Sequence, residues 1–176
     1  MKRFYLLLCI LYLTSCAIFI PGYSDYSSAK KYYKKGQFDL AAYHLSKSLT
    51  LKSNNNKAIY LFELSYKNAV RDHQQKINKL LLIKNKSKWP SLVTEYTSLI
   101  TLGNHVSKLK PLLKSTVNYD LNLKVDDFYD ELSNANSLAA DYHYSLGLKF
   151  QDEIDKESQK QAAINFRLSQ KYIPSY

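Results

Sequence analysis

Residues 24–55 read SDYSSAKKYYKKGQFDLAAYHLSKSLTLKSNN and carry the clearest structural signal in the chain. Small and apolar residues recur at helical intervals on both sides of Gly36. Ala29 and Ala41 are small enough for two antiparallel helices to approach closely, and Gly36 permits a turn between them. The side chains expected to fill the space between the helices are Tyr32, Phe38 and Leu45. The segment therefore predicts a helical hairpin.

The spacing in this hairpin resembles the tetratricopeptide repeat, a helix-turn-helix unit of about 34 residues. Ser48 and Ser53 stand where the family usually has alanine and proline. A second match spans residues 139–176, although its inter-helix segment from Gln151 to Gln161 exceeds the family spacing and predicts a loop. The residues that carry this second match are Leu146, Gly147, Phe150, Ala162, Phe166 and Pro174. The resemblance implies two TPR-like repeats, at about 24–55 and 139–176, within a domain of residues 24–176.

The section between the repeats, residues 56–138, is expected to be a degenerate helical insertion that begins as a half-repeat at Asn56. Its pattern predicts a long helix over 57–84 and a polar break at 85–88. A second helix is predicted over 90–109, with Pro90 in its first turn and Pro111 ending it. Residues 117–125 alternate apolar and polar side chains, as an extended arm across the helices would. Asp126 or Asp127 is expected to cap a helix that runs to about Gln151.

Glycine and proline are scarce in the chain. Four of each occur among 176 residues, too few to separate many short strands. The long stretches between them show helical spacing, and about 160 residues outside the leader suffice for one domain with a core. The expected fold class is therefore all-α, built from TPR-like helical hairpins with an atypical middle section and a short extended arm.

Residues 1–15 have the layout of a secretory signal: Lys2 and Arg3, then about ten apolar residues, then Thr14 and Ser15. The apolar run is too short to cross a bilayer as a helix, which needs about 20 residues. Leu13-Thr14-Ser15-Cys16 resembles the bacterial lipobox. The resemblance implies cleavage before Cys16, with diacylglycerol on its thiol and an acyl chain on its new amino group. An ordinary secretory signal or an uncleaved anchor are the alternatives.

A lipid on Cys16 would hold the protein to a membrane without a spanning helix, since each buried methylene contributes about 0.8 kcal/mol. Residues 16–23 are expected to be the tether. Because the next residue, Ala17, is not acidic, resemblance to lipoproteins of two-membrane bacteria implies the inner leaflet of the outer membrane, facing the periplasm. A single-membrane host would place the protein on the outer face of its plasma membrane.

Removal of the leader leaves 23 basic and 15 acidic residues, a net charge of +8. An exported protein seldom meets nucleic acid, so lipopolysaccharide, wall polymers and anionic lipid are the nearer polyanions. Part of the charge is also explained if the genome is AT-rich, which favours lysine, asparagine and tyrosine codons. The charge alone therefore does not identify a partner.

No catalytic motif is recognisable. His44, His73, His105 and His143 lack metal-binding spacing, and no phosphate-binding loop, CxxC or nucleophile elbow occurs. His143 is expected to be a core histidine. Four carboxylates cluster at a predicted helix start, where the helix dipole stabilises negative charge. They are Asp126, Asp127, Asp130 and Glu131. We therefore expect no enzyme activity, no metal site and no cofactor beyond the lipid on Cys16.

In the family that the repeats resemble, the first helix of each repeat lines a groove for a peptide. The positions carried over are Tyr26, Lys30, Tyr33, Lys34, Tyr60, Lys67 and Tyr144. Aromatic rings with positive charge suit protein recognition, although 16 tyrosines make coincidence a serious alternative. The expected function is a membrane-anchored scaffold or adaptor that binds a protein segment in cell-envelope assembly, with no nucleic acid or small-molecule substrate. The alternative is a binder of peptidoglycan or lipopolysaccharide through its basic surface.

Overall fold

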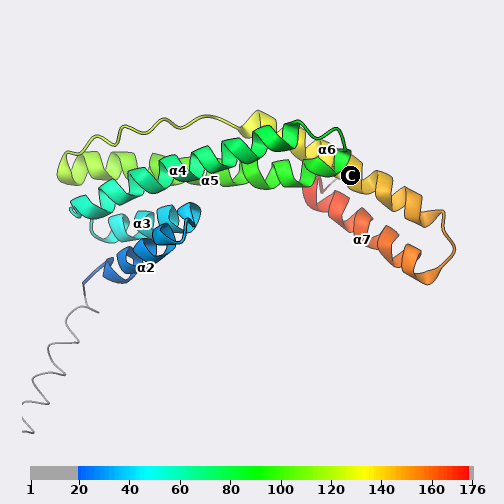
Figure 1. The fold of residues 1–176 in the computed structure, drawn as a ribbon, viewed down its shortest axis with the longest axis horizontal. Coiled ribbons are helices and arrows are strands. Elements are labelled where there is room, and N and C mark those ends of the chain that lie inside the picture. The colour runs from blue at the N-terminus through cyan, green and yellow to red at the C-terminus, as the bar shows by residue number, and fades with distance from the viewer. Residues whose placement is uncertain (1–19, 175–176) are drawn as a thin grey trace, which may run out of the picture. The chain divides into compact units, whose positions relative to one another are not determined.

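A computed structural model describes residues 20–174, and all regular secondary structure in that range is helical (Figure 1). The elements are α2 (Tyr23–Lys34), α3 (Phe38–Leu51), α4 (Asn56–Leu81), the 3-10 helix η1 (Lys86–Lys88), α5 (Trp89–Val117), α6 (Tyr129–Gln151) and α7 (Lys156–Tyr172). The all-α class predicted from the sequence is confirmed. The predicted leader, Cys16 and most of the tether lie outside the described residues.

The chain divides into two compact units, and the long helices α4 and α5 contribute to both. The first unit runs to Val70 and includes Leu102–Val125, so it contains α2, α3, the start of α4 and the end of α5. The second unit comprises Arg71–Thr101 and the chain from Asp126 onward, which adds η1, α6 and α7. The division falls inside α4, inside α5 and, after Val125, in the segment between α5 and α6.

The core of the first unit combines small and large apolar side chains. Ala29 on α2, Ala42 on α3 and Ala58 on α4 are completely buried, so the backbones of these helices lie close together. Their larger neighbours fill the remaining space, namely Leu45, Leu49, Ile59, Phe62, Leu109 and Leu113. Gly36 forms the turn between α2 and α3 with φ 71°, a left-handed conformation that glycine adopts without strain. The hairpin predicted for residues 24–55 is therefore present.

The start of α2 is fixed by a close contact between Gly22 and Ser48 of α3. The Ser48 hydroxyl donates a hydrogen bond of 2.7 Å to the Gly22 carbonyl, and both residues are buried. Gly22 has φ 75°, and a Cβ there would lie 2.6 Å from the Ser48 carbonyl oxygen. Helix α2 thus begins at Tyr23, inside the segment of residues 16–23 that was predicted from the sequence to be a tether.

The predicted end of the second middle helix at Pro111 is wrong, because α5 continues to Val117 with Pro111 inside it. Pro111 is exposed, so water can satisfy the carbonyl that loses its helical partner, and Leu113 anchors the last turns in the core. The following segment, with neither helix nor strand, buries Leu121 and Leu123 against α4 and α5. Lys124 closes this arm by accepting a 2.7 Å hydrogen bond from the Tyr66 hydroxyl through its carbonyl.

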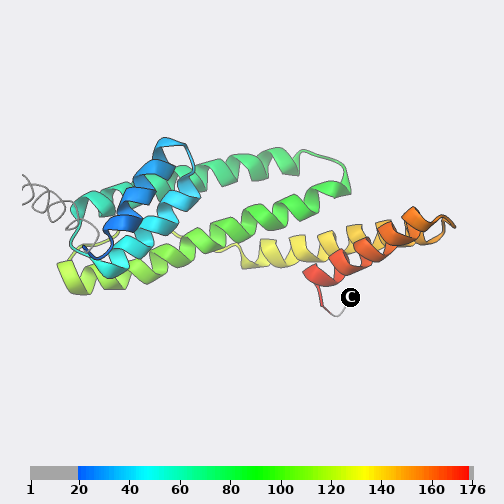
Figure 2. The same cartoon turned by 90° about the horizontal axis from the view of Figure 1, so that it is seen from below.

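In the second unit, α6 and α7 form a hairpin (Figure 2). The loop predicted between them over residues 151–161 is present but shorter, residues 152–155, because α7 already begins at Lys156. The Asp155 carboxylate caps α7 by accepting hydrogen bonds of 3.0 Å from the backbone N–H groups of Glu157 and Ser158. Gly147 on α6 permits a close approach, since a Cβ there would lie 2.5 Å from the Phe166 ring.

Replacement of Ser48 by alanine should lower the free energy of unfolding by about 0.5–1.5 kcal/mol, because the buried Gly22 carbonyl loses one of its two hydrogen-bond donors and keeps the Tyr26 N–H. Urea unfolding followed by circular dichroism measures the change. Thr50→Ala on the same helix is the control, since that exposed hydroxyl only bonds back to the Ser46 carbonyl. Equal stability of the Ser48→Ala variant and the wild type would contradict a structural role for this contact.

Candidate partner-binding groove

One face of α2 carries a row of aromatic and basic side chains. Tyr26, Lys30, Tyr33 and Lys34 follow one another at intervals of four, three and one residues, which places them on the same side of the helix. Ala29 on the buried side of the same helix packs in the core. Ala29 lies three residues after Tyr26 and four before Tyr33, so the two half-buried tyrosines border the buried side of the helix, whereas Lys30 and Lys34 are exposed.

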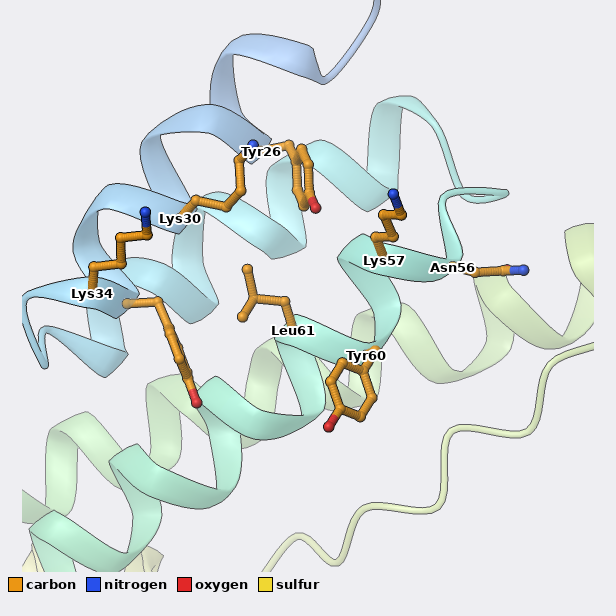
Figure 3. Close-up of a pocket in the computed structure, with 8 residues that line it drawn as sticks. Tyr26, Lys30, Lys34, Asn56, Lys57, Tyr60 and Leu61 are labelled. Carbon is orange, nitrogen blue, oxygen red and sulfur yellow. The ribbon is translucent and has the colours of Figure 1, made fainter.

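The facing wall is the first part of α4, which supplies Asn56, Lys57, Tyr60 and Leu61. The side chain of Asn55 accepts a hydrogen bond of 3.2 Å from the Ala58 N–H and so fixes where the helix begins. Figure 3 shows Tyr26, Lys30 and Lys34 on α2, and Leu61 directed from α4 into the space between the two helices. Because Leu61 also packs against the core, the floor of this space is held in place.

Together these eight residues line a cavity of about 500 Å³, which we call the α2–α4 groove. This volume lies within the range of about 300–1,000 Å³ that is typical of ligand sites. Its surface consists mainly of tyrosine rings, lysine methylenes and Leu61. The groove is therefore an apolar channel with polar groups along its edges.

Positive charge dominates the groove. Lys30, Lys34 and Lys57 are among its lining residues, and no carboxylate is. The nearest acidic residue along α2, Asp25, accepts a 2.8 Å hydrogen bond from His44 and lies 3.9 Å from the Lys47 ammonium, both on α3. The Asp25 charge is thus engaged outside the groove, and the three lysines remain available to an acidic ligand.

Two of the groove tyrosines are held by neighbouring side chains. The Lys30 ammonium lies 4.7 Å from the centre of the Tyr26 ring, a cation–π distance. The Tyr33 ring meets Phe38 edge-on at 5.4 Å, and its hydroxyl lies 3.5 Å from the Asn68 amide nitrogen. Tyr60 is different, because 64% of it is exposed. Tyr60 is therefore the ring most open to a binding partner.

The structure brings five of the seven predicted groove residues to this cavity. Lys67 lies further along α4, exposed and outside the lining. Tyr144 belongs to the second unit, on α6, where its ring lies 5.6 Å from Phe166. The lining residues that the prediction missed are Asn56, Lys57 and Leu61. Lys57 could have been found, since it lies three residues before Tyr60 and therefore on the same face of the helix.

A second cavity of about 400 Å³ lies between α3 and α5 in the same unit. It is lined by Tyr43, Ser46, Lys47, Thr50, Leu51, His105 and Lys108. Burial, with a smaller contribution from Lys108, holds the pKa of His105 below its ordinary value. Two lysines line this cavity and three line the α2–α4 groove, so the groove is the more strongly basic of the two.

The other histidines have structural partners. His73 is buried and bonds to Glu95, and His143 bonds to the Asn165 side-chain oxygen at 2.9 Å and stacks on Tyr172. Within residues 20–174, no group of three or more His, Cys, Asp or Glu side chains is placed to hold a metal ion. In the same range, no helix has the length and apolar character required to span a membrane.

Comparison of the chain with protein-family models, with curated proteins and with solved structures finds no match.

Proposed function

We propose that this protein is a membrane-anchored, periplasm-facing adaptor whose α2–α4 groove holds an extended acidic segment of a protein in a cell-envelope complex. The observation that carries the proposal is the groove itself. Aromatic rings and three lysines from two helices line one cavity that has no carboxylate. The remainder of the proposal, the anchor and the compartment, rests on the signal-like residues 1–15 and on Cys16.

The chemistry of the lining favours a polypeptide over a small molecule. Tyrosine offers a large rigid surface with one polar hydroxyl at small entropic cost, and such residues dominate binding energy at protein interfaces. The lysines lie at the edges, where they attract a carboxylate-bearing chain and increase its rate of association. Asn56 adds an amide able to bond to the backbone of an extended peptide. An acidic segment with apolar side chains therefore fits this groove.

The resemblance of residues 24–55 to a tetratricopeptide repeat supports the same use of these positions, because that family binds peptides along the first helices of its repeats. Here α2 and α4 are the corresponding helices. The lipobox-like sequence before Cys16 supports a place in the envelope, where an anchored adaptor would hold its partner at the membrane. No catalytic step is part of the proposal.

Binding of an envelope polyanion such as peptidoglycan or lipopolysaccharide is the competing function, supported by the charge of +8 without the leader. The two functions differ in their response to salt. Polyanion binding through separate lysines should weaken steeply as the ionic strength rises from about 0.05 to 0.5 M, because the screening length falls from more than about 10 Å to less than about 8 Å. Binding in a groove with an apolar centre should weaken less under the same change, because its apolar contacts are not screened.

Random-peptide display against the full chain should select peptides that combine carboxylates with apolar residues. For a fluorescent copy of a selected peptide, Tyr60→Ala should weaken binding about tenfold or more, since a central tyrosine of an interface commonly contributes that much. Lys57→Glu should weaken it further by placing a like charge against the ligand. Fluorescence anisotropy measures the dissociation constants.

Tyr43→Ala is the matched control for this experiment, because Tyr43 is also an exposed tyrosine of the first unit but lines the other cavity. Helical content should be unchanged in all three variants, since the side chains of Tyr60, Tyr43 and Lys57 lie at the surface. Equal affinities of the Tyr60→Ala and Tyr43→Ala variants, or selected peptides without carboxylates, would refute the groove proposal.

Protein extracted from its native membrane should have the intact mass of a chain that begins at Cys16 and carries diacylglycerol and an N-acyl chain. Cys16→Ser should lose both the lipid and the membrane association, because the serine hydroxyl cannot replace the thiol in this modification. Mass spectrometry of both proteins decides the point. A retained leader or an unmodified Cys16 in the wild type would remove the anchor from the proposal and leave the groove unaffected.

A further inference from the structure

The turn between α4 and α5 displays apolar side chains to solvent. Leu81, Leu82 and Ile83 are all exposed, and Leu82 has 83% of its surface accessible. These residues connect the end of α4 to η1 at the point where the chain reverses direction (Figure 2). Three consecutive exposed aliphatic residues at a turn are costly in water and indicate a binding surface.

This turn, which we call the α4–α5 tip and define as residues 79–89, has an ordered backbone. The Ile83 N–H donates to the Leu80 carbonyl at 3.0 Å, and the Asn85 side chain accepts from the Ser87 N–H at 2.9 Å. On one side, η1 contacts α6 of the same unit. The apolar residues are therefore presented by a fixed turn and not by a loose loop.

Basic residues surround the apolar ones. Lys79, Lys84, Lys86 and Lys88 lie within the tip, and the sequence contains no acidic residue between Asp72 and Glu95. The Lys88 ammonium lies 5.1 Å from the centre of the Trp89 ring and 3.3 Å from the Leu81 carbonyl oxygen. Within the described range, no ion pair engages the other three lysines of the tip. The eleven residues of the tip thus combine exposed apolar side chains with four lysines and a tryptophan.

We propose that the α4–α5 tip inserts Leu81, Leu82 and Ile83 into the surface of an anionic lipid bilayer. The apolar residues protrude from a turn, a shape suited to entering a lipid layer. Lysines near such a surface each increase the affinity about fivefold through attraction to the lipid head groups. Trp89 is suited to the boundary between head groups and acyl chains, where tryptophan is enriched. The tip is thus a membrane contact that does not depend on the lipid at Cys16 or on the α2–α4 groove.

A second turn in the same unit, with an exposed apolar residue but acidic neighbours, provides a comparison for the α4–α5 tip. The turn between α6 and α7 also exposes an apolar residue, Ile154, whose surface is fully accessible. There the neighbours are Asp152, Glu153 and Asp155, which an anionic bilayer would repel. Both turns therefore expose apolar side chains but differ in charge, and of the two only the α4–α5 tip complements anionic lipid.

Trp89 is the only tryptophan of the chain, so its fluorescence reports on the tip alone. The full chain is reconstituted into phosphatidylcholine vesicles with bromine on the acyl chains, with or without phosphatidylglycerol. In phosphatidylglycerol vesicles, Trp89 emission should shift to shorter wavelength and be quenched by bromine. Leu82→Asp should reduce the ratio of inserted to free protein about tenfold, because the exposed Leu82 side chain no longer gains free energy by transfer to an apolar phase. Lys84→Glu should also reduce quenching.

Ile154→Asp is the control, because it removes an exposed apolar residue from the other turn and should leave Trp89 quenching unchanged. Since the readout is local to the tip, an anchor at Cys16 that holds the protein on the vesicle gives no signal by itself. Unquenched Trp89 emission in phosphatidylglycerol vesicles, or equal quenching of the wild type and the Leu82→Asp variant, would overturn the proposal. Crosslinking of an unquenched tip to a protein would identify a protein partner in place of lipid.

Discussion

The close approach of α2, α3 and α4 is the constraint on which the candidate groove depends. Ala29, Ala42 and Ala58 have no surface exposed, and each occupies a place where a larger side chain would separate the helices. The Gly22–Ser48 contact adds a second restraint at the start of α2. With α2 and α3 held in this way, the groove side of α2 lies beside the first turns of α4, and the cavity between the two helices results from the packing beneath it.

The same packing places the acidic and the basic side chains of α2 on different sides of the helix. The side of the helix that turns toward α3 carries Asp25, which pairs with His44 and lies near Lys47. The groove side carries Lys30 and Lys34 without a carboxylate. A helix whose composition is mixed therefore presents a basic surface to the groove. This separation, more than the net charge of the chain, is the basis for proposing an acidic partner.

The sequence allowed much of the fold to be predicted, because its helical hairpin depends on local signals. Gly36 and the alanines around it mark the turn and the closely packed helices, and four groove residues follow from the spacing along α2. What could not be predicted depends on contacts distant in sequence. Pro111 is tolerated inside α5 because of its exposed position, and the role of Ser48 appears only when Gly22 lies beside it. Membership of Leu61 in the groove likewise depends on where α4 meets α2.

The central claim is that the α2–α4 groove receives a segment of another envelope protein. A photo-crosslinking amino acid in place of Tyr60, introduced in the native host, tests this most directly, with the same substitution at Tyr43 as the reference. After irradiation and mass spectrometry, the account predicts that position 60 crosslinks reproducibly to one protein through an acidic segment and that position 43 does not. Identical crosslinking patterns at the two positions, or crosslinks from position 60 only to lipid or glycan, would contradict it.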